Sequence, residues 1–156
     1  MTIVSIIIAV AIVVADFLTK RFVYLNISPG ETFGAFTPLI DFTYVQNTGA
    51  AFGMLSGMMS VLAIISIAFC IGMIIFWIIK KPTHKLLCTS LALIFAGALG
   101  NGIDRVAYGF VVDFIETTFI EFPVFNIADI GVTVGAALLM IYLIFFDKED
   151  ADTKKE

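Results

Sequence analysis

The side chains of this sequence that could carry out chemistry are aspartates and asparagines beside long apolar stretches. Asn126 and Asp129 are three residues apart and would share one face of a helix, and Asn101 stands in the same relation to Asp104. Asp113 lies between these two pairs. An ionisable residue in or beside a membrane helix is costly and is a candidate functional group by default. These residues therefore predict one shared polar site.

Two carboxylates can hydrolyse an amide bond without a metal or a cofactor. If Asp113 and Asp129 face one another in a low-dielectric site, they cannot both ionise, and the pair retains one proton. The ionised member can then take a proton from a bound water, while the protonated member donates to the carbonyl oxygen. The aspartate pair is the most economical chemistry for this site.

Other catalytic and metal sites lack the residues they need. The single histidine, His84, falls in a Lys-rich turn remote from the acids, which excludes a Ser-His-Asp triad, a Cys-His pair and a histidine zinc site. Cys70 and Cys88 lie in apolar runs without the spacing of a zinc or redox pair. We expect no metal and no cofactor. A Ser-Lys dyad remains an alternative, using Lys20 with one of three serines, Ser28, Ser56 or Ser60.

The composition identifies a membrane protein. Of 156 residues, 60% are hydrophobic and 14% charged, and the mean hydropathy is +1.05, whereas soluble domains carry about 25% charge. The net charge of -4 provides no basic surface for nucleic acid. The sequence predicts an all-α integral membrane protein of one domain, 1–156, with four transmembrane helices, a small extracytoplasmic β-sheet and an interfacial segment.

Uncharged stretches and turn signals place the elements along the chain. The first helix lacks a basic segment before it and is interpreted as retained, not as a cleaved signal peptide. The predicted helices are about 3–24, 54–79, 86–104 and 123–146; the connections are an extracytoplasmic β loop at 26–53, a cytoplasmic turn at 80–85, an extracytoplasmic interfacial segment at 106–122 and a cytoplasmic tail at 147–156.

Lysine distribution sets the expected orientation. Lys80, Lys81 and Lys85 join the tail lysines on one side, and only Lys20, Arg21 and Arg105 lie on the other. Because positive residues are enriched in cytoplasmic loops, both termini should be cytoplasmic and the polar site should lie at the extracytoplasmic boundary. Small residues in the third and fourth helices, including Gly97 and Gly135, would let these helices approach closely.

Four ordered motifs resemble those of the bacterial lipoprotein signal peptidases, also called signal peptidase II. The resemblance spans nearly the whole chain. The motifs are Asp16–Lys20 (DFLTK), Asn47–Gly53 (NTGAAFG), Gly97–Arg105 (GALGNGIDR) followed by Val111–Ile115 (VVDFI), and Phe125–Asp129 (FNIAD). The resemblance implies an aspartic endopeptidase of the bacterial cytoplasmic (inner) membrane that cuts prolipoproteins just before a diacylglyceryl-modified cysteine.

The resemblance also implies roles for single residues. Asp113 and Asp129 match the catalytic aspartates of the family. Residues that bind substrate or shape the site match Asn47, Gly49, Asn101, Arg105, Asn126, Asp16 and Lys20. The implied partners are diacylglyceryl-modified prolipoproteins and membrane lipids, with globomycin as an expected inhibitor. From the net charge we expect no nucleic-acid partner, and we expect a monomeric enzyme.

Two departures and four alternatives remain at this point. Phe17 and Ile130 stand where the family often has Gln and a small polar residue. Asp16 and Lys20, four residues apart, could form a simple interfacial ion pair, and Asp104 could merely end the third helix. A proton-coupled transporter would need acids through the depth of the bilayer, but the middle of each helix is uncharged. A structural assembly partner would leave the clustered acids unexplained.

Overall fold

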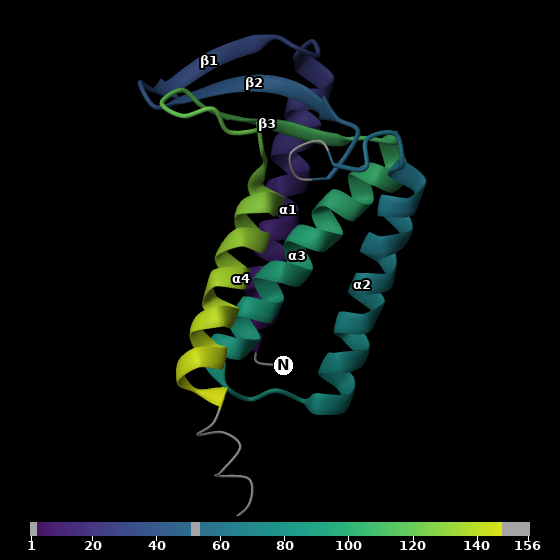
Figure 1. Ribbon diagram of the computed structural model, residues 1–156, viewed down its shortest axis with the longest axis vertical. Helices are drawn as coiled ribbons and strands as arrows, with labels where there is room; N and C mark the ends of the chain where they lie inside the picture. The colour runs from purple at the N-terminus through teal and green to yellow at the C-terminus, as the bar shows by residue number, and fades with distance from the viewer. Residues whose placement is uncertain (1–2, 51–53, 148–156) are drawn as a thin grey trace, which may run out of the picture.

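Four long helices form the body of the protein in a computed structural model that describes residues 3–50 and 54–147 (Figure 1). They are α1 (Ile3–Asn26), α2 (Met59–Lys80), α3 (Lys85–Tyr108) and α4 (Ile127–Phe145). Each is long and apolar enough to cross a membrane, and most of their large apolar side chains face outward. This confirms the predicted all-α integral membrane fold.

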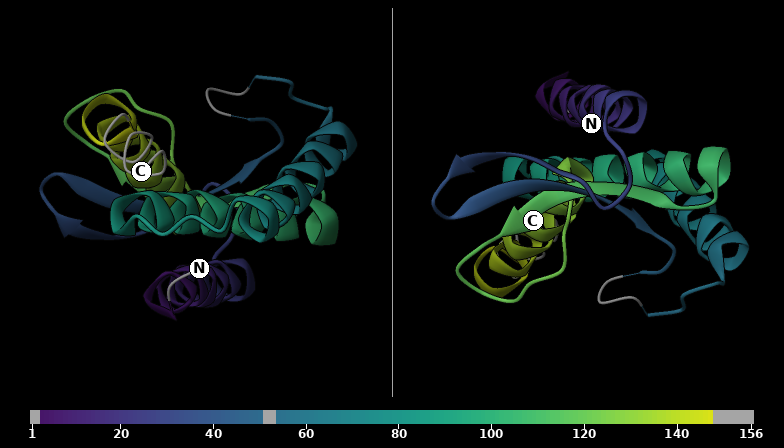
Figure 2. Two further views of the ribbon diagram at one scale, coloured as in Figure 1. Left: turned by 90° about the horizontal axis from the view of Figure 1, so that it is seen from below. Right: turned by 90° about the horizontal axis from the view of Figure 1, so that it is seen from above.

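Helix α3 is the centre of the bundle. It packs against each of the other three helices, and Figure 2 shows α1 on one side of it with α2 and α4 on the other. Half of its most apolar window is buried, against 22% in each other helix. Its small side chains explain this, because Ala92 and Ala96 are fully buried in a cluster with Ala9 and Trp77.

Glycines allow α3 and α4 to touch backbone to backbone, as the sequence predicted. A Cβ atom on Gly135 would lie 2.8 Å from the carbonyl oxygen of Ser90, and one on Gly97 would overlap the carbonyl oxygen of Ala128. Close approach of this kind gives membrane helices their van der Waals contact. The first turns of α4 are thereby held against α3.

A small antiparallel sheet lies across the end of the bundle where α1 and α3 finish and α2 and α4 begin, which we call the sheet end (Figure 1). Its strands are β1 (Thr32–Thr37), β2 (Ile40–Asn47) and β3 (Val111–Thr117), in the order β1-β2-β3. Two of them come from the predicted β loop, which confirms a small sheet.

Residues 106–122, predicted as an interfacial segment, contain a third strand that the sequence did not predict. Helix α3 extends to Tyr108, and β3 then pairs with β2 instead of lying free. The physical reason is burial: Val112 and Phe114 pack with Val23 and Tyr44 in a second core cluster. Of the aromatic residues that suggested an interfacial segment, Phe114 and Phe110 pack in or against this core, whereas Phe119 and Phe122 are exposed, and the interfacial position stays a prediction.

Two helix starts also differ from the sequence prediction. Helix α2 begins at Met59 instead of Met54, because residues 54–57 form a turn in which Leu55 and Gly57 have positive φ. Helix α4 begins at Ile127 instead of Pro123, because Asn126 acts as its N-cap. Hydropathy alone cannot show either boundary, since the residues on both sides are apolar.

We predict that Gly135→Ala destabilises the bundle while Gly72→Ala does not. The added methyl would overlap the carbonyl oxygen of Ser90 and the side chain of Ile94, whereas a methyl on Gly72 would meet nothing within 4 Å. Overpacking costs about 1–3 kcal/mol, so the melting temperature in detergent should fall only for Gly135→Ala. Equal melting temperatures would show that α3 and α4 do not touch at this position.

Candidate active site

Asp113 is positioned by strand β3. Gly109 ends α3 in a left-handed conformation, and the strand that follows buries four successive residues, 111–114. The Asp113 side chain is 2% exposed. Its Oδ2 accepts a hydrogen bond from Asn47 Nδ2 at 2.9 Å, across the pairing of β3 with β2. Gly49 N donates to Asn47 Oδ1 at 2.9 Å and fixes that side chain.

Asp129 is positioned by the first turn of α4. Asn126 and Asp129 form a reciprocal capping box: Asp129 N donates to Asn126 Oδ1 at 3.0 Å, and Asn126 N donates to Asp129 Oδ2 at 3.1 Å. Asn101 of α3 donates from Nδ2 to Asp129 Oδ1 at 2.7 Å. Both carboxylate oxygens of Asp129 therefore have fixed positions.

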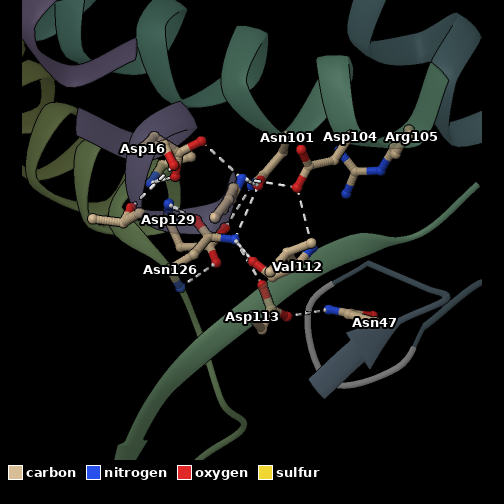
Figure 3. Close-up of polar contacts among 12 residues, drawn as sticks. Asp16, Asn47, Asn101, Asp104, Arg105, Val112, Asp113, Asn126 and Asp129 are labelled. Carbon is tan, nitrogen blue, oxygen red and sulfur yellow. Dashed lines mark hydrogen bonds and ion pairs between the residues drawn. The ribbon is translucent and has the colours of Figure 1, made fainter. Parts of the chain in front are cut away.

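Asn126 links the two aspartates directly. Its Nδ2 donates to Asp113 Oδ1 at 2.6 Å and to Asn101 Oδ1 at 3.0 Å, and its side chain is completely buried. Asn126 therefore contacts both carboxyl groups, one through its side chain and the other through its capping box (Figure 3). The structure thus brings together the two residues that the sequence selected.

A buried lysine supports this network from α1. Lys20 Nζ lies 2.8 Å from Asp16 Oδ2 and 3.2 Å from Asp104 Oδ2, and it donates to Asn101 Oδ1 at 2.8 Å. Asp16, Lys20 and Asp104 are each less than 5% exposed. The i, i+4 pair of the sequence is therefore part of a buried network and not an isolated interfacial pair.

The two acids of this network also hold backbone groups of the site. Asp16 Oδ1 accepts from Ala128 N, at the start of α4, at 2.8 Å, and Asp104 Oδ2 accepts from Val112 N at 3.0 Å. Gly100 makes room for the first contact, since a Cβ atom there would lie 2.5 Å from Asp16 Oδ2. Asp104 does more than end α3: it fixes the strand residue before Asp113.

A cavity of about 670 Å³ opens between α2, α3, α4 and the sheet end. Its polar lining includes Asn47, Asn101, Arg105, Asp113 and Asp129. Most of the remaining lining is apolar, with side chains such as Ile65, Phe69, Val111, Ile130 and Val134. The cavity can therefore take a largely apolar ligand beside two carboxyl groups.

The pKa of the Asp113 carboxyl is raised to about 7. Burial is the largest cause, and the charge of Asp129 raises it further, while hydrogen bonds from Asn47 and Asn126 lower it in part. The aspartate pair can therefore hold a proton on Asp113 up to near-neutral pH. One acid and one base are then available in the same cavity.

The other sequence-predicted residues have clear positions. Gly49 is buried, donates its backbone N–H to Asn47 Oδ1, and does not line the cavity. Residues 51–53 of the same motif lie outside the described residues. Ile130 lines the cavity, whereas Phe17 is 48% exposed on α1. The Ser-Lys alternative has no geometric basis among the described residues, because Lys20 Nζ contacts Asp16, Asp104 and Asn101 instead of a serine.

Ser66 is a polar residue of the cavity that was not identified from the sequence. Ser66 of α2 lines the cavity and accepts a hydrogen bond from Arg105 Nη1 at 3.3 Å. A serine in an apolar helix ordinarily bonds back to its own backbone, so its type and position carry no functional signal. The described residues contain no group of three or more His, Cys, Asp or Glu side chains that could hold a metal ion.

Four apolar helices around a cavity with paired aspartates define an integral membrane enzyme, and comparisons with known proteins specify its class. The family model described as signal peptidase (SPase) II matches residues 8–145. A protein of Staphylococcus haemolyticus named lipoprotein signal peptidase is 36% identical to this chain, and the match covers 97% of this chain and 95% of the relative. A protein of Lactobacillus johnsonii with the same name is 39% identical, and that match covers 92% of this chain and 94% of the relative.

A solved bacterial membrane enzyme is similar over the whole structure. It superposes with a TM-score of 0.85 at 40% identity, covering 98% of this chain and 92% of that chain. The chain belongs to the signal peptidase II family, the lipoprotein signal peptidases, and is accordingly a protease.

We predict that Lys20→Met strongly destabilises the protein, whereas Lys85→Met does not. Removing the lysine leaves Asp16 and Asp104 buried without a counter-charge, which costs about 3–5 kcal/mol. Lys85 is exposed and serves as the control. Thermal unfolding in detergent measures the difference, and adding Asp16→Asn with Asp104→Asn should recover part of the loss. An unchanged melting temperature for Lys20→Met would refute the supporting role of this network.

We also predict that the Asp113 carboxyl titrates near pH 7 and that Asp129→Asn shifts its titration to lower pH. The direction follows because the negative charge of Asp129 raises the pKa of Asp113 by disfavouring its ionisation. Infrared difference spectra against Asp113→Asn isolate the protonated carboxyl band of this residue. The absence of that band at pH 5.5 would contradict the raised pKa.

Proposed function

We propose that this lipoprotein signal peptidase uses Asp113 and Asp129 as an aspartic dyad that activates water. The observation that carries the proposal is the shared contact with Asn126, which holds both carboxyl groups beside one cavity. Two positioned carboxyl groups that share one proton supply a base and an acid without further groups. Family membership supports peptide hydrolysis as the reaction.

In the proposed reaction, Asp129 is the base and Asp113 is the acid. Asp129 takes a proton from water as the water oxygen attacks the scissile carbonyl carbon, and Asp113 donates its proton to the carbonyl oxygen. When the tetrahedral intermediate collapses, the C–N bond breaks and the proton on Asp129 passes to the leaving amine. The hydroxyl proton returns to Asp113. The raised pKa of Asp113 favours this assignment of the acid.

The proposed substrate is a prolipoprotein whose lipobox cysteine carries a diacylglyceryl group, cut just before that cysteine. The apolar walls of the cavity suit acyl chains and an apolar signal-peptide helix. Asn47, Asn101 and Arg105 line the cavity and offer hydrogen-bond donors to the substrate backbone. The remaining site-shaping residues, Gly49, Asn126, Asp16 and Lys20, act from behind these groups.

The proposed location is the bacterial cytoplasmic membrane, with both termini cytoplasmic and the site at the extracytoplasmic face. The sheet end holds the network of Asp16, Lys20 and Asp104. The opposite end carries Lys80 at the end of α2, Lys81 in the connection, and Lys85 at the start of α3. This lysine excess supports a cytoplasmic position for that connection. The diacylglyceryl chains could then stay in the bilayer while the scissile bond reaches the dyad.

The proposed enzyme works as a monomer among membrane lipids, and globomycin should compete with substrate for the cavity. Both aspartates and the supporting network come from a single chain. Competition would appear as a rise in apparent KM without a change in kcat.

We predict that Asp113→Asn and Asp129→Asn each lower kcat at least about a hundredfold, the usual contribution of a positioned acid or base. The measurement is cleavage of a diacylglyceryl-modified prolipoprotein by purified protein in detergent. Glu121→Gln, which removes an exposed acid, is the matched control. The native enzyme should leave the unmodified prolipoprotein uncut.

Retained cleavage in either folded aspartate variant would remove that residue from the dyad. Cleavage of unmodified prolipoprotein at the native rate would refute dependence on the lipid. No cleavage of the modified prolipoprotein by the folded native protein would overturn the proposed substrate.

A further inference from the structure

Arg105 is the cation of the site that is least constrained by the aspartates. Its guanidinium lines the cavity, yet Arg105 forms no salt bridge with any described carboxylate. Figure 3 shows it beside Asp104 with no dashed contact to the other residues drawn. Its Nε is buried and has no hydrogen-bond partner among the described residues. Something other than an aspartate must therefore hold this side chain.

The Arg105 guanidinium contacts Ser66 of α2. Arg105 Nη1 donates to Ser66 Oγ at 3.3 Å, and Ser66 Oγ donates its own hydrogen to Leu62 O at 2.9 Å. A hydroxyl has one hydrogen and two lone pairs, so this back-bond leaves Ser66 only its acceptor capacity. Ser66 is therefore oriented to accept from a cation.

The approach of α2 to α3 at this level depends on Gly102. A Cβ atom on Gly102 would lie 3.1 Å from the Ser66 Cβ atom, which is tighter than ordinary packing. Gly102 and Arg105 are three residues apart on α3, so they lie on neighbouring parts of one helix face. The same contact that brings α2 to α3 thus places the Ser66 hydroxyl against Arg105.

We propose that Ser66 is a positioning residue that holds the Arg105 guanidinium toward the cavity and away from the aspartate pair. In this arrangement, the unused donors of Arg105 are available to a main-chain carbonyl of the bound signal peptide. Both carboxylates attract the guanidinium, so loss of the Ser66 acceptor would let it turn toward them. The proposal rests on the proposed function, since it concerns binding of that substrate.

The first test compares Ser66→Ala with Ser60→Ala, a matched change at an exposed position of the same helix. The probe is a synthetic lipobox peptide with a diacylglyceryl cysteine. Loss of one hydrogen bond to a charged group corresponds to about a tenfold effect on binding, so KM should rise about five- to tenfold for Ser66→Ala with kcat nearly unchanged. Ser60→Ala should match the native enzyme, and Ser66→Thr, which keeps the hydroxyl, should retain the native KM.

The second test is a double-mutant cycle with Arg105→Gln. If Ser66 acts through Arg105, Ser66→Ala should change kcat/KM less than about twofold once Arg105 is absent. Melting temperatures in detergent should stay close to the native value for each variant, because no buried apolar group is removed.

The outcomes separate this inference from the proposed function. An equal rise in KM in the presence and absence of Arg105 would show that Ser66 acts through helix packing, and would overturn the inference. Identical kinetics for Ser66→Ala and Ser60→Ala would overturn it while the enzyme remains a peptidase. Failure of the native protein to cut the lipopeptide would overturn the proposed function and this inference with it.

Discussion

The buried charge of Lys20 is the constraint on which the sheet end depends. A cation inside a helical bundle needs counter-charges and hydrogen-bond acceptors, and Asp16, Asp104 and Asn101 supply them. Each of these partners also holds another part of the site. Asp16 accepts from the start of α4, Asp104 from strand β3, and Asn101 donates to Asp129. One desolvated charge thereby helps to fix four elements, α1, α3, α4 and β3, relative to one another.

Asn126 connects the two aspartates within this framework. It caps α4 through the box with Asp129, and its side-chain amide reaches Asp113 on the neighbouring strand. The same residue therefore satisfies the free N–H groups of a helix end and fixes the spacing of two acids. Structural demands and the proposed chemistry coincide at Asn126, so substitutions that disturb the cap should also disturb the aspartate pair.

The membrane setting determines how the rest of the molecule is built. Most large apolar side chains of α1, α2 and α4 face outward, and the glycines of α3 and α4 let the helix backbones meet. Polar groups collect at the sheet end, where they contact one another and the backbone. The cavity beside them combines apolar walls with a few charged groups, which is consistent with the proposed substrate.

The sequence by itself determined the four helices, the small sheet and the candidate aspartates, because hydropathy and i, i+3 spacing are local properties. It could not place β3, since the burial of Val112 and Phe114 depends on Tyr44 and Val23 from distant segments. Nor could it distinguish a surface pair from a buried network for Lys20, or single out Ser66. Only the tertiary structure decided these points, because desolvation and hydrogen bonding between remote residues exist only once the helices have packed.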